Sequence, residues 1–542
     1  MGDEKMEEKK ILKNKIFLYI TEFMAGICVM AVELGAQRLL APYFSSSQIV
    51  WTIVIGTIMI AMALGNIYGG KTADKNPNPN RLYARIIIAS IWLGLIPWLG
   101  KYVIAGLSAL LIFTVSSGYL IIASLASCLV LFIFPLFLLG TTTPSLAKYA
   151  TKSLDESGKT VGTLGAFNTV GSIIGTFLPT FVTIPTIGTN MTFLIFAILL
   201  FLIGVIYFAS IKVFQVKIAV GIVLITLGVI FGYKTDFTFW AEEALYDGES
   251  EYNYLRVTQN GSRTELSTHA LFSVQSVYYE EKVLRSSSYY DYCLATILMN
   301  PDYQERDLDI LVLGMGSGTF ATEAAKYYDN LNITGVEIDK KITELAYKYF
   351  NMSDKWVVYD YDGRAFLNVD ENKYDIIMVD AYQDITIPFQ MSTIEFFTLV
   401  KNHLKDDGVM VVNLNMRSDE EGNINYYLCD TISNCFSQMY LVDVISTTNR
   451  ELFASNNEKM LEVFEDNLEK EKDEALKKYL KKYVYSGLEQ YEATDLLLTD
   501  DKAPVELLGI DVIDTLIDEE ISFYKEIYKE KGLKGLLELL QQ

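Results

Sequence analysis

Long apolar runs fill the first part of the chain and end near residue 232. They lie at 15–36, 47–70, 83–100, 102–140, 160–185, 190–210 and 214–232, and the fourth is long enough for one long helix or two short ones. A helix crosses a bilayer with about 20 apolar residues. We therefore predict a charged tail at 1–14 and a multi-span transmembrane domain of seven or eight helices at 15–235. A buried globular core is the weaker alternative, because so many long runs follow one another.

A few polar residues interrupt these runs. Glu22 and Glu33 lie within the first run, Arg38 lies near its end, and Asn66 and Asn168 are candidates for the same interior. An ionisable group in hydrocarbon is costly and usually faces a partner or a wet cavity. Two interpretations stay open: a pathway or ligand pocket, and a structural Glu–Arg or Glu–Asn clasp. Four glycines are predicted to be close-packing positions between helices, namely Gly162, Gly165, Gly171 and Gly175.

The second half of the chain alternates short apolar strands with helical segments. A linker and a small antiparallel β unit are predicted over 236–305, because Asn260-Gly261 is a strong hairpin-turn signal. Strands are predicted at 309–313, 333–337, 356–359, 375–379 and 409–413, with helices at 320–328, up to residue 350, and at 393–404. This alternation predicts an α/β Rossmann-like core with a doubly wound parallel sheet over 306–456. An acidic helical region should follow over 457–542.

Polar residues and glycines gather where the predicted strands end. Gly314, Gly316, Ser317 and Gly318 follow the first strand, in a loop that lets the backbone approach a ligand closely. The other strand ends carry Glu337, Asp362-Gly363 and Asp380. A carboxylate at 337 can accept both ribose hydroxyls, and one at 362 can receive an adenine amino group. The loop lacks the sixth-position glycine of dinucleotide sites, which favours an S-adenosyl ligand over NAD.

Charge and rare residues exclude several classes of function. The net charge of −22 argues against a nucleic-acid partner, since phosphate binding needs a basic face. Acidity suits a cationic small substrate, and it also simply keeps a protein soluble. The five cysteines have no paired or metal-ligand spacing, so we predict neither a disulfide framework nor a metal site. With only His269 and His403, a histidine-based triad is not expected, and His403 is predicted to lie at the surface.

From about residue 250 to 508 the sequence resembles the spermidine synthases, a family of polyamine aminopropyltransferases. The whole chain resembles their membrane-fused branch, in which a multi-span, transporter-like region precedes the synthase domain. The matching motifs are Tyr252-Asn253-Tyr254, Phe272-Ser273-Val274-Gln275-Ser276, Tyr289-Tyr290-Asp291-Tyr292, the glycine loop, Val336-Glu337-Ile338-Asp339, Asp362-Gly363-Arg364, Asp380-Ala381-Tyr382, Ile387-Pro388-Phe389 and the segment from Leu498 to Glu506 that contains Thr-Asp-Asp-Lys-Ala-Pro.

The resemblance implies an activity and a set of roles. An aminopropyl group would pass from decarboxylated S-adenosylmethionine to a polyamine, releasing methylthioadenosine. Asp380 matches the family's proton acceptor. The donor site would include Asn253, Gln275, Gly314, Gly316, Ser317, Gly318, Glu337, Asp362, Gly363 and Pro388. The acceptor site would include Tyr290, Asp291 and Asp384, the last displaced by one residue from the family's pattern.

Two departures from the family pattern leave the donor open. Ser317 stands where the family has an aspartate, and Tyr290 stands where it has a histidine. An aspartate at 317 would repel the carboxylate of intact S-adenosylmethionine, so a serine there favours the intact donor. Methyl transfer, aminocarboxypropyl transfer and sulfonium cleavage are the alternative reactions. A transporter or sensor that binds a polyamine or nucleoside without turnover is an alternative of a different class.

The expected location is an integral, multi-pass protein of the cell membrane, in contact with the lipid bilayer. Basic residues mark the amino-terminal tail and three connections, and the positive-inside rule places these in the cytoplasm. With seven helices, the soluble domain would then lie outside the cell. An S-adenosyl donor is made in the cytosol, so the soluble domain should lie inside, which requires an even number of helices. We favour eight helices and a cytoplasmic soluble domain. A homodimer and a monomer both remain open.

Overall fold

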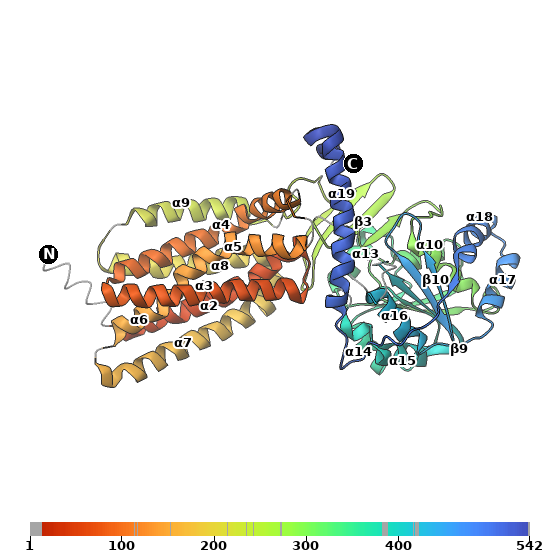
Figure 1. Ribbon diagram of the computed structural model, residues 1–542, viewed down its shortest axis with the longest axis horizontal. Helices are drawn as coiled ribbons and strands as arrows, with labels where there is room; N and C mark the ends of the chain where they lie inside the picture. The colour runs from red at the N-terminus through yellow and green to blue at the C-terminus, as the bar shows by residue number, and fades with distance from the viewer. Residues whose placement is uncertain are drawn as a thin grey trace. The chain divides into compact units, whose positions relative to one another are not determined.

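The computed structural model describes residues 14–112, 114–115, 118–151, 153–213, 215–234, 236–241, 243–270, 274–381, 388–415, 417 and 422–539. The chain divides into two compact units (Figure 1). The first comprises Met1–Ala241 with Glu538–Gln542, and the second comprises Glu242–Leu537.

The first unit is a bundle of long apolar helices (Figure 1). Its helices are α2 (Lys15–Phe44), α3 (Gln48–Lys75), α4 (Pro79–Ile112), α5 (Tyr119–Gly140), α6 (Thr142–Ala150), α7 (Ser157–Leu178), α8 (Ile184–Ser210) and α9 (Val216–Gly232). A π-helical turn, η2 (Pro179–Thr183), joins α7 to α8, and Gly188 adopts a positive φ of 81° near the start of α8. Since both α7 and α8 pack against α2, the chain folds back between them.

Five helical segments of the described chain are long and apolar enough to cross a membrane, and α9, with 17 residues, is shorter. The structure corrects one predicted boundary. The run at 102–140 is neither one helix nor two, because residues 102–112 continue α4 and α5 begins only at Tyr119. Lys101 does not interrupt α4, since its ammonium lies 3.0 Å from the carboxylate of Asp236. The stretch that we expected to supply an eighth helix therefore does not do so.

The interior of this unit holds a buried carboxyl group. Oε1 of Glu22 accepts hydrogen bonds from Thr143 Oγ1 at 2.5 Å and from Asn168 Nδ2 at 2.9 Å, while Oε2 has no hydrogen-bond partner among the described residues. Of the two interpretations, the Glu–Asn clasp therefore describes these contacts of Glu22. Asn66, by contrast, is exposed on α3 and does not belong to this interior.

The glycine prediction is half right. A Cβ atom at Gly171 would lie 2.2 Å from the carbonyl oxygen of Phe23, and one at Gly175 would lie 2.3 Å from that of Ile27. These two glycines therefore let α7 approach α2 closely. Gly162 and Gly165 have open space beside them, so the prediction is wrong for that pair.

The second unit begins with the small antiparallel sheet that the hairpin signal predicts. Its strands are β1 (Tyr246–Glu249), β2 (Tyr254–Asn260), β3 (Arg263–Ser267) and β4 (Ser276–Tyr279), paired in chain order. The turn between β2 and β3 contains Gly261 at a positive φ of 62°. The short helices α10 (Tyr289–Cys293) and α11 (Ala295–Leu298) follow and are fully packed into the core.

The main sheet of the described chain has eight strands in the order β12-β10-β11-β9-β8-β5-β6-β7. The parallel strands are β5 (Leu308–Leu313), β6 (Leu331–Glu337), β7 (Val357–Asp360), β8 (Tyr374–Val379) and β9 (Leu404–Leu414). The helices between them are α12 (Thr319–Ala325), α13 (Lys340–Tyr349), α14 (Gly363–Val369) and α15 (Ile394–His403). Each predicted strand exists within a few residues. The sheet confirms the doubly wound α/β class for this half of the chain.

The far edge of the sheet is antiparallel, and the sequence pattern did not predict it. It consists of β10 (Gln438–Asp443), β11 (Arg450–Ser455) and β12 (Glu489–Gln490). The remaining helices are α16 (Ile424–Ser433), α17 (Met460–Lys470), α18 (Glu474–Tyr479) and α19 (Val505–Leu539). His403 is buried rather than at the surface, because its ring nitrogens contact the carbonyl oxygens of Leu399 and Asp370 at 2.8 and 3.0 Å.

Candidate active site

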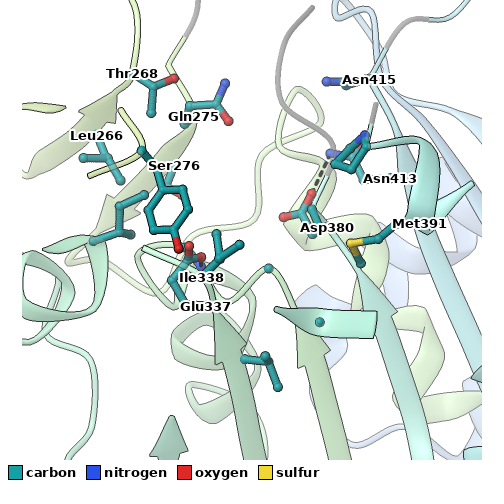
Figure 2. A pocket seen from close by; sticks show the side chains of 18 of the residues that line it. Leu266, Thr268, Gln275, Ser276, Glu337, Ile338, Asp380, Met391, Asn413 and Asn415 are labelled. Atoms are coloured by element: carbon teal, nitrogen blue, oxygen red, sulfur yellow. Dashed lines mark hydrogen bonds between the residues drawn. The ribbon is translucent and has the colours of Figure 1, made fainter. Parts of the chain in front are cut away.

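The ends of the parallel strands surround a cavity of about 350 Å³. Figure 2 shows Gln275, Ser276 and Glu337 on one side of it, and Asp380 and Asn413 on the other. The cavity extends from the small sheet, through the glycine loop, to the last residues of β9. Such a crevice at the carboxyl ends of parallel strands is where doubly wound folds bind ligands.

The glycine loop after β5 brings bare backbone to the cavity wall. Gly314 and Gly316 line the cavity and adopt positive φ values of 84° and 54°. A Cβ atom at Gly314 would lie 2.5 Å from the carbonyl oxygen of Asp380, so only glycine allows β5 and β8 to end this close together. Gly318, also at positive φ, packs against Met352 instead of lining the cavity.

Glu337 ends β6 and supports the loop from the side. Its Oε2 accepts a hydrogen bond from the backbone of Gly316 at 2.9 Å, and its Oε1 accepts one from that of Asp339 at 3.0 Å. Burial raises the pKa of this carboxyl group to about 7. Asp362 caps α14 through a 2.8 Å bond from the backbone of Ala365, and both Asp362 and Gly363 line the cavity. Carboxylate oxygens therefore face the space where the sequence predicts a ribose and an adenine.

Asp380 follows β8 and is held by two neutral donors. Tyr289 donates its hydroxyl to Oδ2 at 2.8 Å, and Asn413 donates its amide to Oδ1 at 2.9 Å. Asn449 in turn donates to Oδ1 of Asn413 at 2.7 Å, which fixes the orientation of that amide. Burial raises the pKa of Asp380 to about 7, and the two hydrogen bonds oppose that rise. A carboxyl group with a pKa near 7 can take up a proton at neutral pH, as a general base must.

The structure brings most of the predicted site residues together. Gln275, Gly314, Gly316, Glu337, Asp362, Gly363, Asp380 and Pro388 line the cavity. Others lie outside its lining: Asn253 bonds Asp339, the Tyr290 hydroxyl lies 3.4 Å from the backbone oxygen of Gln275, and Asp291 accepts a 2.6 Å bond from the backbone of Arg285. Asp384 falls in 382–387, outside the described residues.

Ser317 does not face the cavity either. Its side chain is 1 % exposed, and its hydroxyl lies 2.9 Å from that of Thr319 in the first turn of α12. The prediction that residue 317 meets the amino-acid end of a donor therefore finds no support in these contacts. No cluster of three His, Cys, Asp or Glu side chains that could hold a metal ion exists among the residues described.

Comparison with known proteins identifies the domain. Residues 293–466 match the model of the spermine/spermidine synthase domain. A probable polyamine aminopropyl transferase of Bifidobacterium longum is 45 % identical over 352 residues, which cover 62 % of this chain and 78 % of the relative. The chain belongs to the polyamine aminopropyltransferase family. A second relative, the polyamine aminopropyltransferase of Oceanobacillus iheyensis, is 24 % identical over 441 residues, covering 75 % of this chain and 79 % of its own.

The solved structures are more distant. A probable spermidine synthase of Corynebacterium glutamicum is 16 % identical, with a TM-score of 0.35, and the match covers 47 % of this chain and 99 % of that one. The chain is thus a polyamine aminopropyltransferase-like enzyme in which a bundle of apolar helices precedes the synthase domain.

The sequence pattern did not single out three residues of this candidate site, namely Tyr289, Asn413 and Asn449. Tyr289 lies beside Tyr290 in the matched motif, yet only the structure shows which of the two hydroxyls reaches Asp380. Asn413 lies at the end of the last predicted parallel strand, so the rule that selected Glu337 and Asp380 also applies to it. Asn449 precedes an antiparallel strand that was not predicted, and no sequence signal marks it.

Proposed function

We propose that the protein is an integral-membrane aminopropyltransferase that uses decarboxylated S-adenosylmethionine as donor and a polyamine as acceptor. The observation that carries this proposal is Asp380, half-buried at the cavity wall, where two neutral donors bond it and no cation among the described residues does. Such a carboxylate can attract a protonated amine and then take its proton. The nucleoside of the donor would occupy the side of Glu337 and Asp362.

The transfer requires a neutral amine, because a protonated amine has no free electron pair. Asp380 would accept a proton from the acceptor, whose nitrogen then attacks the methylene carbon next to the sulfonium. The new C–N bond forms as the C–S bond breaks, and the electron pair of that bond returns to sulfur. The products are the aminopropylated amine and neutral methylthioadenosine. Because the sulfonium leaves easily, correct placement of the two reactants should supply much of the rate.

The decarboxylated donor is preferred over intact S-adenosylmethionine on the evidence of the Ser317 contacts. Ser317 stands where the family has an aspartate, but its hydroxyl faces Thr319 and not the cavity. The change from aspartate to serine therefore gives no reason to expect that the cavity accepts the carboxylate of intact S-adenosylmethionine. The acidic residues at the cavity, Glu337, Asp362 and Asp380, would repel one. Calorimetry with both donors, on wild type and Ser317→Asp, tests this choice. We expect tighter binding of the decarboxylated donor in both proteins, and equal or tighter binding of the intact donor would contradict it.

The activity is tested by incubating the purified full-length protein with decarboxylated S-adenosylmethionine and putrescine, cadaverine or spermidine. Methylthioadenosine should accumulate only when an amine is present. Release without an amine would indicate sulfonium cleavage. No product with any donor, while nucleoside still binds, would favour the transporter or sensor hypothesis instead.

Membrane integration is proposed from the composition and exposure of the first unit. Its outward side chains include Met59, Ile60 and Phe181, which are 64 %, 57 % and 69 % exposed in a chain without lipid. An apolar surface of this kind suits hydrocarbon and not water. Alkaline carbonate should therefore leave the protein in the membrane fraction, and its release into the supernatant would contradict the proposal.

The aminopropyltransferase domain is proposed to face the cytoplasm, where its donor is made. If α7 and α8 each cross the membrane, α2 to α5 and α7 to α9 make an odd number of crossings, and the basic connections then lie outside. This arrangement opposes the positive-inside rule, so only a measurement can decide between the two arguments. We expect that an impermeant maleimide will not label an Asp407→Cys variant in intact cells. Labelling would place the domain outside.

A further inference from the structure

The segment from Leu498 to Glu506 lies far from the glycine loop in sequence, and the proposed chemistry gives it no role. Its Thr499–Lys502 portion is a tight turn, in which the backbone of Lys502 donates to the carbonyl oxygen of Thr499 at 2.9 Å and accepts a 3.1 Å bond in return. Leu498 is buried, and its carbonyl oxygen accepts a 2.9 Å bond from the backbone of Ile394. The turn therefore presents Asp500 and Asp501 at a fixed place beside the start of α15.

Asp500 is the residue through which this turn contacts the rest of the domain. Its two carboxylate oxygens accept hydrogen bonds from Nη1 and Nη2 of Arg364 at 2.7 and 2.5 Å. Oδ1 also accepts a 2.7 Å bond from Thr393, and the backbone of Asp500 donates to Glu395 at 3.0 Å. A two-pronged arginine–carboxylate pair fixes direction as well as distance. Asp501, one residue further, is exposed.

Arg364 extends this contact to the cavity wall. Its Nη1 also donates to the backbone oxygen of Gln390 at 3.0 Å. Arg364 directly follows Asp362 and Gly363, which line the cavity, and Gln390 lies next to Met391 in the same wall. A Cβ atom at Gly363 would lie 3.2 Å from the Cε of Met391, so the start of α14 and the segment at 388–391 touch at this point. The arginine thus ties together two segments that meet at one side of the pocket.

We propose that Asp500 is a positioning residue for the nucleoside end of the donor site. Acting through Arg364, it holds the segment at 388–391 against the start of α14, and thereby sets the width of the pocket beside Asp362. The inference rests on the proposed function only in assuming that a nucleoside binds there. Asp500 touches no reacting atom in this account. Its removal should therefore weaken nucleoside binding without slowing the transfer step at saturating donor.

A contribution to stability alone would predict a different pattern. The side chains of Arg364 and Asp500 are 20 % and 39 % exposed, and partly exposed ion pairs contribute little to the stability of a fold. If the pair only stabilised the domain, its loss would lower the melting temperature and the active fraction, and would leave the dissociation constant of the remaining folded protein unchanged. Affinity and kcat therefore separate the two roles.

The experiment is calorimetric titration of the full-length protein with methylthioadenosine, in wild type, Asp500→Asn, Arg364→Gln, the double variant and Asp501→Asn. We expect Asp500→Asn and Arg364→Gln each to weaken binding by roughly tenfold, which corresponds to the free energy of about one hydrogen bond. The double variant should be no weaker than either single one, because both remove the same contact. Asp501→Asn makes the same charge change one residue away and should bind as wild type does. Asp500→Glu should recover part of the loss.

Each outcome leads to a distinct conclusion. Equal affinity in wild type and Asp500→Asn would overturn the positioning role, as would additive losses in the double variant. A shared fall of kcat and acceptor KM with unchanged nucleoside affinity would also overturn it. If wild type itself fails to bind methylthioadenosine, the proposed donor site is wrong, and that result is distinguishable from failure of the Asp500 proposal alone.

Discussion

Each unit of the protein holds a carboxyl group that neutral donors bond and that no cation of the described residues contacts, and the contrast between Glu22 and Asp380 shows what distinguishes a candidate site. Glu22 sits within a helix bundle, where a threonine and an asparagine both bond one of its oxygens. Asp380 sits at the end of a strand, where two donors hold it one on each oxygen and its side chain borders a cavity. Neutral hydrogen-bond donors are common to both, so they do not indicate a function by themselves. The position of Asp380 at a strand end beside a cavity is what makes it the candidate catalytic group.

The two units also differ in where their apolar and polar side chains lie. The helical unit exposes large apolar side chains such as Phe177 and Phe181, and it buries Glu22. In the synthase domain, buried apolar residues form a large cluster against the main sheet and a smaller one beneath the small sheet, and polar groups line the cavity at the strand ends. One unit thus presents an apolar surface, and the other presents polar groups at the wall of a cavity.

The largest effect on turnover should come from removing the carboxylate of Asp380, and the same change at Glu22 serves as the comparison. Asp380→Asn keeps the hydrogen-bonding shape but cannot accept a proton, so turnover should fall by about 10²–10⁴-fold, the usual range for a general base. Methylthioadenosine affinity should stay within about twofold. Glu22→Gln is the matched change in the other unit and should leave turnover of the folded protein unaltered. Steady-state kinetics on both variants checks this, and a comparable loss in Glu22→Gln would break the contrast between the units.

A smaller effect is expected on binding when Glu337 is changed. Burial raises the pKa of this group to about 7, so it is ionised and a better acceptor for ribose hydroxyls above that pH. Nucleoside affinity should therefore fall as the pH drops below about 7. Glu337→Gln should weaken binding by about 10- to 100-fold at pH 8, since a hydrogen bond to a charged group contributes about 1.5–3 kcal/mol, and should abolish the pH dependence.

The control for this prediction is Glu344→Gln, which removes an exposed carboxylate that pairs with Lys341 on α13. Calorimetric titrations at several pH values should show it unchanged. If Glu337→Gln bound the nucleoside as tightly as wild type at pH 8, the ribose would have to lie elsewhere in the cavity.

The sequence predicted the parts of this site that follow from periodicity. Five parallel strands were found because each is a short apolar run, and Glu337 and Asp380 were found because they end such runs. The donors to Asp380 were not found, because the partner of a tyrosine hydroxyl depends on how α10 packs rather than on local pattern. Ser317 differs from these residues, because it lies in the predicted glycine loop but its hydroxyl contacts that of Thr319, a contact that the local pattern does not indicate.

The helical unit was predicted less well for a related reason. Apolar runs indicate helices, but they do not show where one helix ends within a longer apolar stretch. Lys101 looks like an interruption in the sequence, yet its partner Asp236, more than a hundred residues away, lets α4 continue through it. Gly171 and Gly162 have the same local surroundings in sequence, and only packing shows that one meets α2 and the other does not.

The smallest predicted effect is a shift in a pH profile. The pKa of Asp380 is raised to about 7 by burial, and the hydrogen bond from Tyr289 lowers it. Tyr289→Phe removes a donor that favours the ionised form, so the pKa should rise further. Since only ionised Asp380 can accept a proton, the acidic limb of kcat/KM against pH should move from about 7 to higher pH. Kinetics from pH 5.5 to 9 at subsaturating substrate measures it, and a limb that moves to lower pH would contradict the role of this bond.

The central claim is that this cavity transfers an aminopropyl group from sulfur to an amine, and a single-turnover experiment tests it most directly. The protein is mixed with decarboxylated S-adenosylmethionine labelled in its aminopropyl carbons, together with an unlabelled polyamine, and the products are identified by mass spectrometry. We expect the label in the amine, one equivalent of unlabelled methylthioadenosine, and transfer at least about 100-fold slower in Asp380→Asn although that variant binds the donor. Label that stays on the nucleoside while the amine gains a methyl group, or transfer by Asp380→Asn at the wild-type rate, would contradict the account.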